Sequence, residues 1–182
     1  MGSIKGQKHN PYIIGRYAHV NKNDVVFTPD WLAQKICSMF EITGRVLEPC
    51  KGEGVFLKYL PENTDWCEIA DGKNYYDYDK KVNWIVTNPP YSDFNRFLEH
   101  SFNLAENIVL LVPVAKMFKS MGTMKSIFNY GGIVSCHILS GGQAGFPFGF
   151  PIGVYHLERG YKGETKLGLL VESPIQTQGK LF

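Results

Sequence analysis

Short apolar segments alternate with segments of helical periodicity along most of this chain, and that alternation limits its fold more than any other feature. The run 108–114 (IVLLVPV) is the most hydrophobic, as expected of a strand that is buried on both faces. Further strands are expected at 45–48, 66–69, 84–86, 133–139 and 152–157, with an edge strand within 167–171. Strands that alternate with helices predict an α/β domain with a largely parallel sheet.

Length and composition favour one domain of ordinary size, because 182 residues with 44% hydrophobic and 20% charged content are typical of a globular protein. We expect an irregular N-terminal arm at 1–26 and a single domain at 27–182. The net charge of +2 is too small to indicate nucleic-acid binding by itself. The four cysteines form no CxxC pair, so we expect no metal site and reduced thiols in a soluble, cytoplasmic protein without a membrane span.

The tetrapeptide Asn88-Pro89-Pro90-Tyr91 follows directly after the apolar strand 84–86. Two prolines lack backbone N–H groups and favour extended neighbours, so this turn is stiff and presents mainly acceptors. The Asn88 amide adds an oxygen, and Tyr91 adds a flat aromatic face. Such a turn suits a planar molecule with an exocyclic amino group, although it is also compatible with a proline-rich turn whose tyrosine packs on the core.

A second turn, Gly52-Glu53-Gly54, follows the strand 45–48 and is predicted to open a helix. Glycines in such a strand–turn–helix unit allow a ligand to approach the backbone closely. The third glycine of the dinucleotide motif is absent, because position 57 is leucine. Glu48 before the turn would repel a pyrophosphate and suits a cationic or amino-bearing ligand.

Other polar residues follow at spacings that indicate a nucleoside. Glu68 lies 20 residues after Glu48, as 68 − 48 = 20, and doubly wound folds place a ribose-binding carboxylate at about that spacing. The alternative is a surface glutamate at the end of a strand. Asn74 is either a turn residue or a partner for the edge of a base. Upstream, Thr28 is expected to cap a helix that has Pro29 in its first turn.

The loop 141–151 is rich in glycine, proline and phenylalanine, with Phe146, Phe148 and Phe150 at alternate positions. Its rings either pack against the body of the protein or provide a surface on which bases stack.

Together these motifs resemble the S-adenosylmethionine-dependent amino-methyltransferases of the DNA adenine-N6 type, over 27 to about 160. Asn88-Pro89-Pro90-Tyr91 is similar to the catalytic tetrapeptide of that family. Glu48-Pro49 with Gly52 and Gly54 resembles its methionine-binding loop, and Phe27-Thr28-Pro29 the motif that closes over the cofactor. By this resemblance Glu68 would bind the ribose hydroxyls and Asn74 the adenine.

The resemblance implies a Rossmann-like methyltransferase fold, with helices on both faces of the sheet and an antiparallel strand near the C-terminus. It also implies methyl transfer from S-adenosylmethionine to N6 of adenine in DNA after base extrusion, with Tyr91 stacked on the base and one ring of 146–150 on its other face. Little sequence after residue 160 is left for a recognition domain, so a specificity subunit or a homodimer is the expected partner. RNA adenine or guanine N2, protein glutamine, and an idle binding subunit are the alternatives.

Overall fold

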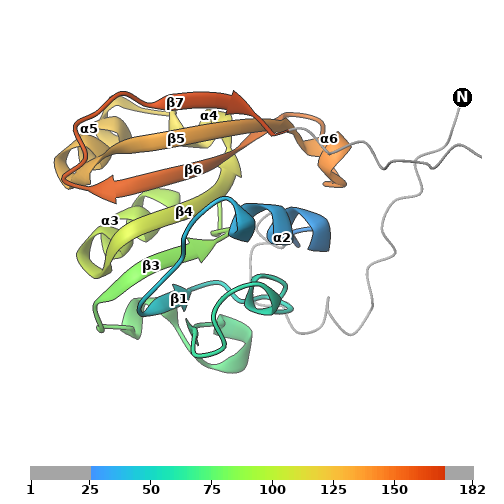
Figure 1. Ribbon diagram of the computed structural model, residues 1–182, viewed down its shortest axis with the longest axis vertical. Helices are drawn as coiled ribbons and strands as arrows, with labels where there is room; N and C mark the ends of the chain where they lie inside the picture. The colour runs from blue at the N-terminus through green and yellow to red at the C-terminus, as the bar shows by residue number, and fades with distance from the viewer. Residues whose placement is uncertain (1–25, 171–182) are drawn as a thin grey trace, which may run out of the picture.

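A seven-stranded sheet forms the centre of the protein in the computed structural model, which describes residues 26–170 (Figure 1). Its strands are β1 (Val46–Glu48), β2 (Asp65–Trp66), β3 (Val82–Thr87), β4 (Ala105–Pro113), β5 (Gly131–Ser140), β6 (Pro151–Arg159) and β7 (Lys166–Leu169). They are ordered β2-β1-β3-β4-β6-β5-β7. Only β6 runs antiparallel to its neighbours, β4 and β5. The mostly parallel sheet and the antiparallel strand near the C-terminus are therefore confirmed.

Helices cover both faces of this sheet. The α-helices are α2 (Asp30–Ser38), α3 (Phe94–Leu104), α4 (Val114–Met117), α5 (Met121–Tyr130) and α6 (Gly141–Ala144), and the 3-10 helices are η2 (Phe56–Lys58), η3 (Ile69–Asp71) and η4 (Tyr75–Asp77). One apolar core lies under α3, α4 and α5, and a second lies under α2, η2 and α6. The strands separate the two cores.

Strand β4 shows why the sequence contains such a long apolar run. Ile108, Leu110 and Val112 point into the first core, whereas Val109 and Leu111 point into the second. Each of these side chains is at most 1% exposed. Because both faces of the strand are covered, alternation between apolar and polar residues is lost, as expected for a central strand.

Two predicted elements near the glycine turn are shorter than expected. The helix predicted after Gly54 is only the 3-10 turn η2, and Gly52 and Gly54 both adopt positive φ angles, +54° and +80°. The strand predicted at 66–69 is only Asp65–Trp66, because the backbone of Glu68 pairs with Lys73 instead of continuing along the sheet. The backbone therefore reverses at the glycine turn itself and again between Glu68 and Lys73.

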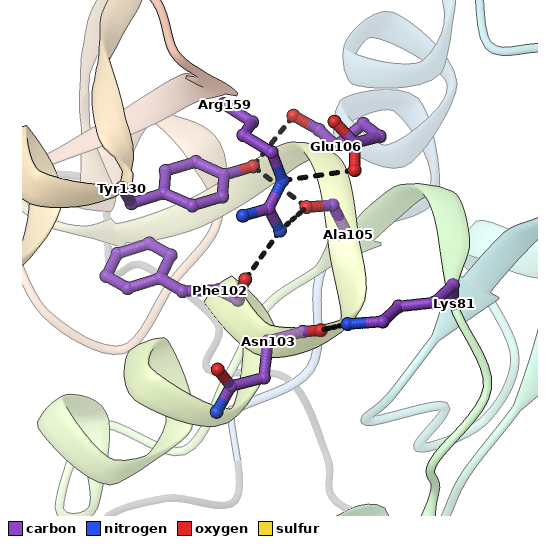
Figure 2. A network of polar contacts seen from close by, with 7 residues as sticks. All are labelled: Lys81, Phe102, Asn103, Ala105, Glu106, Tyr130 and Arg159. Carbon is purple, nitrogen blue, oxygen red and sulfur yellow. Dashed lines mark hydrogen bonds and ion pairs between the residues drawn. The ribbon is translucent and has the colours of Figure 1, made fainter.

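At the end of the sheet where β4 begins and β6 ends, Arg159 ties the end of α3 to these two strands (Figure 2). Its guanidinium donates to the carbonyls of Phe102 (2.6 Å) and Ala105 (2.7 Å), and its Nε donates to the Glu106 carboxylate (3.0 Å). The Tyr130 hydroxyl donates to the Glu106 carbonyl at 2.7 Å. A cation at a helix C-terminus satisfies carbonyls that lack intrahelical partners and interacts favourably with the helix dipole.

Candidate active site

The carboxyl ends of β1 and β3 bring the glycine turn and the proline tetrapeptide together. These strands pair in parallel, with Leu47 opposite Ile85, so Glu48 and Thr87 end the two strands side by side. Asn88 is the next residue along the chain. Ligands of open α/β sheets bind beyond the carboxyl ends of the strands, and this position is therefore the candidate active site.

Three hydrogen bonds fix the side chain of Asn88. Its Nδ2 donates to the carbonyl of Val26 (3.0 Å) and to the Thr28 hydroxyl (3.2 Å). Its Oδ1 accepts from the Tyr91 hydroxyl at 2.9 Å. An amide oxygen has two lone pairs, so Oδ1 can accept a second hydrogen bond while the amide plane stays fixed.

Tyr91 serves the protein core as well as Asn88. Its side chain is 9% exposed and lies in the core beneath α3, among residues such as Phe94. The hydroxyl orients the Asn88 amide oxygen. Stacking of a base on this ring stays a prediction, and it requires a larger exposed face than the ring has here.

The segment before α2 closes over the same place. Phe27, Thr28, Gly52 and Asn88 all line a cavity of about 50 Å³, and the Phe27 ring lies next to Gly52. Thr28 is not the N-cap predicted from the sequence, because α2 begins at Asp30 after Pro29 and Thr28 accepts the hydrogen bond of Asn88 instead. The cavity has room for one or two water molecules and is smaller than a nucleoside-sized ligand.

Glu68, which caps η3 after β2, braces the glycine turn. One carboxylate oxygen accepts from the Gly52 N–H at 2.7 Å, and the other accepts from the Ala70 N–H at 3.0 Å. The side chain is only 5% exposed. The predicted ribose contact remains compatible with this arrangement, because each carboxylate oxygen can accept a further hydrogen bond.

Glu48 is completely buried at the centre of the site. Its Oε1 accepts from the Thr87 hydroxyl at 2.5 Å and from the Cys50 N–H at 3.0 Å. Its Oε2 is buried without a hydrogen-bond partner among residues 26–170. Burial raises the pKa of this carboxyl to about 8, against the effect of the two hydrogen bonds.

Asn74 lies apart from these groups. Its side chain caps η4 by accepting from the Tyr76 N–H at 3.2 Å. It lines a different cavity of about 390 Å³ at the edge of the sheet, together with Trp66 and Lys73. The proposed contact between Asn74 and an adenine stays a prediction, because the structure does not bring Asn74 into the cavity that Gly52 and Asn88 share.

The three phenylalanines after α6 form a stacked column. The ring centroids of Phe146 and Phe148 are 5.3 Å apart, and those of Phe148 and Phe150 are 4.0 Å apart, with interplanar angles of 7° and 2°. Phe146 is buried in the core, whereas Phe150 is 46% exposed. Of these three candidates for base stacking, Phe150 therefore offers the most accessible ring.

Sequence reasoning missed two groups near the site. Thr87 donates a hydrogen bond to Glu48. The only sequence signal for this residue was its position immediately before the tetrapeptide. The indole ring of Trp66 lies beneath the ammonium groups of Lys51 (3.9 Å) and Lys73 (3.4 Å), and Lys51 also pairs with Asp71 at 2.6 Å. No short sequence motif marks that arrangement.

Within residues 26–170 no group of three or more His, Cys, Asp or Glu side chains could hold a metal ion. None of the helices in that same range has both the length and the apolar character needed to cross a bilayer.

No protein-family model matches the chain, and no curated protein sequence matches it. Solved methyltransferase structures do resemble it. A provisionally described class I S-adenosylmethionine-dependent methyltransferase from Listeria monocytogenes aligns with a TM-score of 0.63 at 14% identity, over 87% of this chain and 70% of that one. A provisionally described RNA methyltransferase from Pyrococcus horikoshii aligns with a TM-score of 0.58 at 13% identity, over 86% and 93%.

The M protein of the type I restriction enzyme EcoKI aligns with a TM-score of 0.60 at 14% identity, over 73% of this chain. The aligned region spans 44% of that longer protein. At such identities the likeness concerns the fold, and it confirms the expected Rossmann-like methyltransferase architecture.

Proposed function

We propose that this protein transfers the methyl group of S-adenosylmethionine to the exocyclic N6 amino group of adenine in DNA. The observation that supports this most is the Asn88 amide, which is fixed by three hydrogen bonds beside a glycine turn and two buried carboxyl groups. That arrangement places a hydrogen-bond acceptor for an amine next to carboxyl groups that can bind a positively charged ligand.

The residues of the turn fit the proposed cofactor. Gly52 and Gly54 adopt left-handed backbone conformations and leave the main chain accessible. Glu48 and Glu68 place two carboxyl groups at this turn, and within residues 26–170 neither forms an ion pair with a lysine or arginine. The bound cofactor would supply an electrophilic methyl group on a positively charged sulfur.

Asn88 would act on the amine. The N6 lone pair of adenine is delocalised into the ring, and Asn88 Oδ1 with the Pro89 carbonyl would accept its two hydrogens and favour localisation of that lone pair. Positive charge develops on the nitrogen during transfer, so these contacts strengthen in the transition state. The remaining contribution is positioning for a direct in-line transfer.

The base must leave its stack before it reaches Asn88, at a cost of a few kcal/mol in a duplex. Phe150 would offer its exposed ring to the extruded base, and Tyr91 would stack on the base once a local movement exposes more of its ring. We further propose that a specificity subunit or a second copy of the chain directs the reaction to its target.

Methyl transfer from radiolabelled cofactor to separate DNA, RNA and protein pools tests this function. We expect label in DNA, loss of that label in Asn88→Ala, and wild-type labelling in Asn63→Ala, which alters an exposed asparagine that does not line the cavity shared by Gly52 and Asn88. Label in RNA alone would replace the proposal with its RNA alternative, which the Pyrococcus neighbour favours. Cofactor binding without label in any pool would indicate an idle binding subunit.

A further inference from the structure

Thr87 and Glu48 form a buried pair that links the glycine turn to the tetrapeptide. Thr87 is 1% exposed, and its hydroxyl donates to Glu48 Oε1 at 2.5 Å. The pair lies directly behind the candidate cofactor site, because Cys50, which donates its N–H to Glu48, and Asn88, which follows Thr87, both line the cavity there.

The groups that surround Glu48 supply no positive charge. Glu68 approaches from the end of β2 and opposes ionisation of Glu48, and the thiols of Cys37, Cys50 and Cys67 have pKa values raised mainly by burial, so they stay neutral. Within the described part of the chain no lysine or arginine forms an ion pair with Glu48. A buried carboxyl in such surroundings is a neutral acid at pH 7.

We propose that Thr87 is a positioning residue whose hydroxyl orients Glu48 behind the candidate cofactor site, where the carboxyl releases its proton to solvent when the positively charged methyl donor binds. This inference rests on the proposed function, because it takes the sulfonium donor as the ligand. It adds a proton to the binding equilibrium and gives Thr87 a role that none of the sequence motifs assigned to it.

Linkage gives the direction of the pH effect. The empty protein carries the proton on Glu48 below about pH 8, with the pKa raised by burial. A cation in a site of low dielectric constant favours the carboxylate, so the complex binds fewer protons than the empty protein. Donor affinity therefore rises with pH by at most about tenfold per pH unit and levels off above about pH 8.

Thr87 sets where this rise ends. A hydroxyl that donates to the carboxylate lowers the pKa of Glu48, so Thr87→Val, which keeps the shape and removes the donor, raises it. A hydrogen bond to a charged group corresponds to a shift of about one to two pH units. Thr87→Ser keeps the hydroxyl and should keep the wild-type profile.

Isothermal titration calorimetry of the full chain with S-adenosylmethionine tests the inference, at pH 6.5 to 9 and in two buffers with different ionisation enthalpies. Near pH 7 the wild-type protein should release more protons on binding than Glu48→Gln. The amino group of the ligand also titrates in this range, and its ionisation in free solution is common to both proteins and cancels in the comparison. At pH 9 the donor affinity of Thr87→Ser should have levelled off, whereas that of Thr87→Val should still be rising.

Infrared difference spectroscopy of the wild-type protein gives a readout that does not depend on Thr87→Val folding. The carboxylic acid C=O band should disappear when the donor binds, and Glu48→Gln should lack this change. Donor binding with the same proton count in wild type and Glu48→Gln would overturn this inference alone. Equal profiles for Thr87→Val and Thr87→Ser would remove the role of Thr87, whereas no donor binding by the wild type would overturn the proposed function as well.

Discussion

Replacement of Glu68 by alanine should destabilise the protein more than the loss of an ordinary surface glutamate. The two oxygens of Glu68 accept from the Gly52 and Ala70 N–H groups at 2.7 and 3.0 Å, in a side chain that is 5% exposed. A hydrogen bond to a charged group contributes about 1.5–3 kcal/mol. We take the lower part of the summed range, about 3–4 kcal/mol, because water can reach the two N–H groups once the side chain is removed.

Thermal and urea denaturation measure this loss. For a chain of this length about 1 kcal/mol shifts Tm by about 2–4 °C, so Glu68→Ala should lower Tm by about 6–16 °C. Glu68→Gln keeps one acceptor oxygen and points an NH₂ group at a backbone donor, so its Tm should lie between those of the wild type and Glu68→Ala. Glu62→Ala, at an exposed glutamate, is the matched control and should unfold like the wild type.

The same substitution should weaken the binding of S-adenosylmethionine, since the braced glycine turn is part of the proposed cofactor site. Calorimetric titration at a temperature where Glu68→Ala stays folded separates this effect from unfolding. If Glu68→Ala matches Glu62→Ala in Tm, the argument that Glu68 braces the turn is wrong. If its Tm falls while its donor affinity stays at the wild-type value, Glu68 is a structural residue outside the cofactor site.

Three further outcomes are expected. Asn88→Ala should lower the transfer rate at least about a hundredfold with donor affinity nearly unchanged, as measured by single-turnover kinetics and calorimetry; equal loss of both would contradict a role confined to the amine. Arg159→Met should lower the free energy of unfolding by about 2–3 kcal/mol in urea titrations, because it removes the cation from the carbonyls that end α3, whereas Lys119→Met, at an exposed lysine, should have little effect. Burial lowers the pKa of His156 from 6.5 to about 4, so its neutral form favours the folded state above pH 6.5, and stability should fall by about 2–3 kcal/mol between pH 6.5 and 4. If the free energy of unfolding of His156→Gln falls with pH as steeply as that of the wild type between pH 6.5 and 4, another group causes the loss of stability.

The fold follows from the sequence where one local pattern decides the structure. The run 108–114 predicts a doubly buried strand, and β4 (Ala105–Pro113) is that strand. The helical spacing of Phe94, Phe97, Leu98 and Phe102 predicts one inward face of α3. The first three side chains are buried, and Phe102 is partly buried against the same core. The glycine turn and the tetrapeptide each follow directly after a strand in the sequence. Because these strands, β1 and β3, are parallel neighbours, both motifs lie at the carboxyl end of the sheet.

The parts that the sequence did not predict depend on contacts between distant residues. The helix after Gly54 reduces to a 3-10 turn because two left-handed glycines and the Glu68 carboxylate fix that backbone. The Thr28 hydroxyl accepts from Asn88, 60 residues away, and so does not cap α2. These residues become neighbours only when the sheet has assembled, so a local sequence pattern cannot predict their hydrogen bonds.

Identification of the methylated product tests the central claim most directly. After incubation of the protein with S-adenosylmethionine and a DNA of varied sequence, the DNA is digested to nucleosides and analysed by mass spectrometry against the same reaction with Asn88→Ala. We expect N6-methyldeoxyadenosine in the wild-type reaction and none with Asn88→Ala. A methyl group on another atom of the nucleosides, or equal N6 methylation by both proteins, would contradict the proposal that Asn88 directs transfer to this amine.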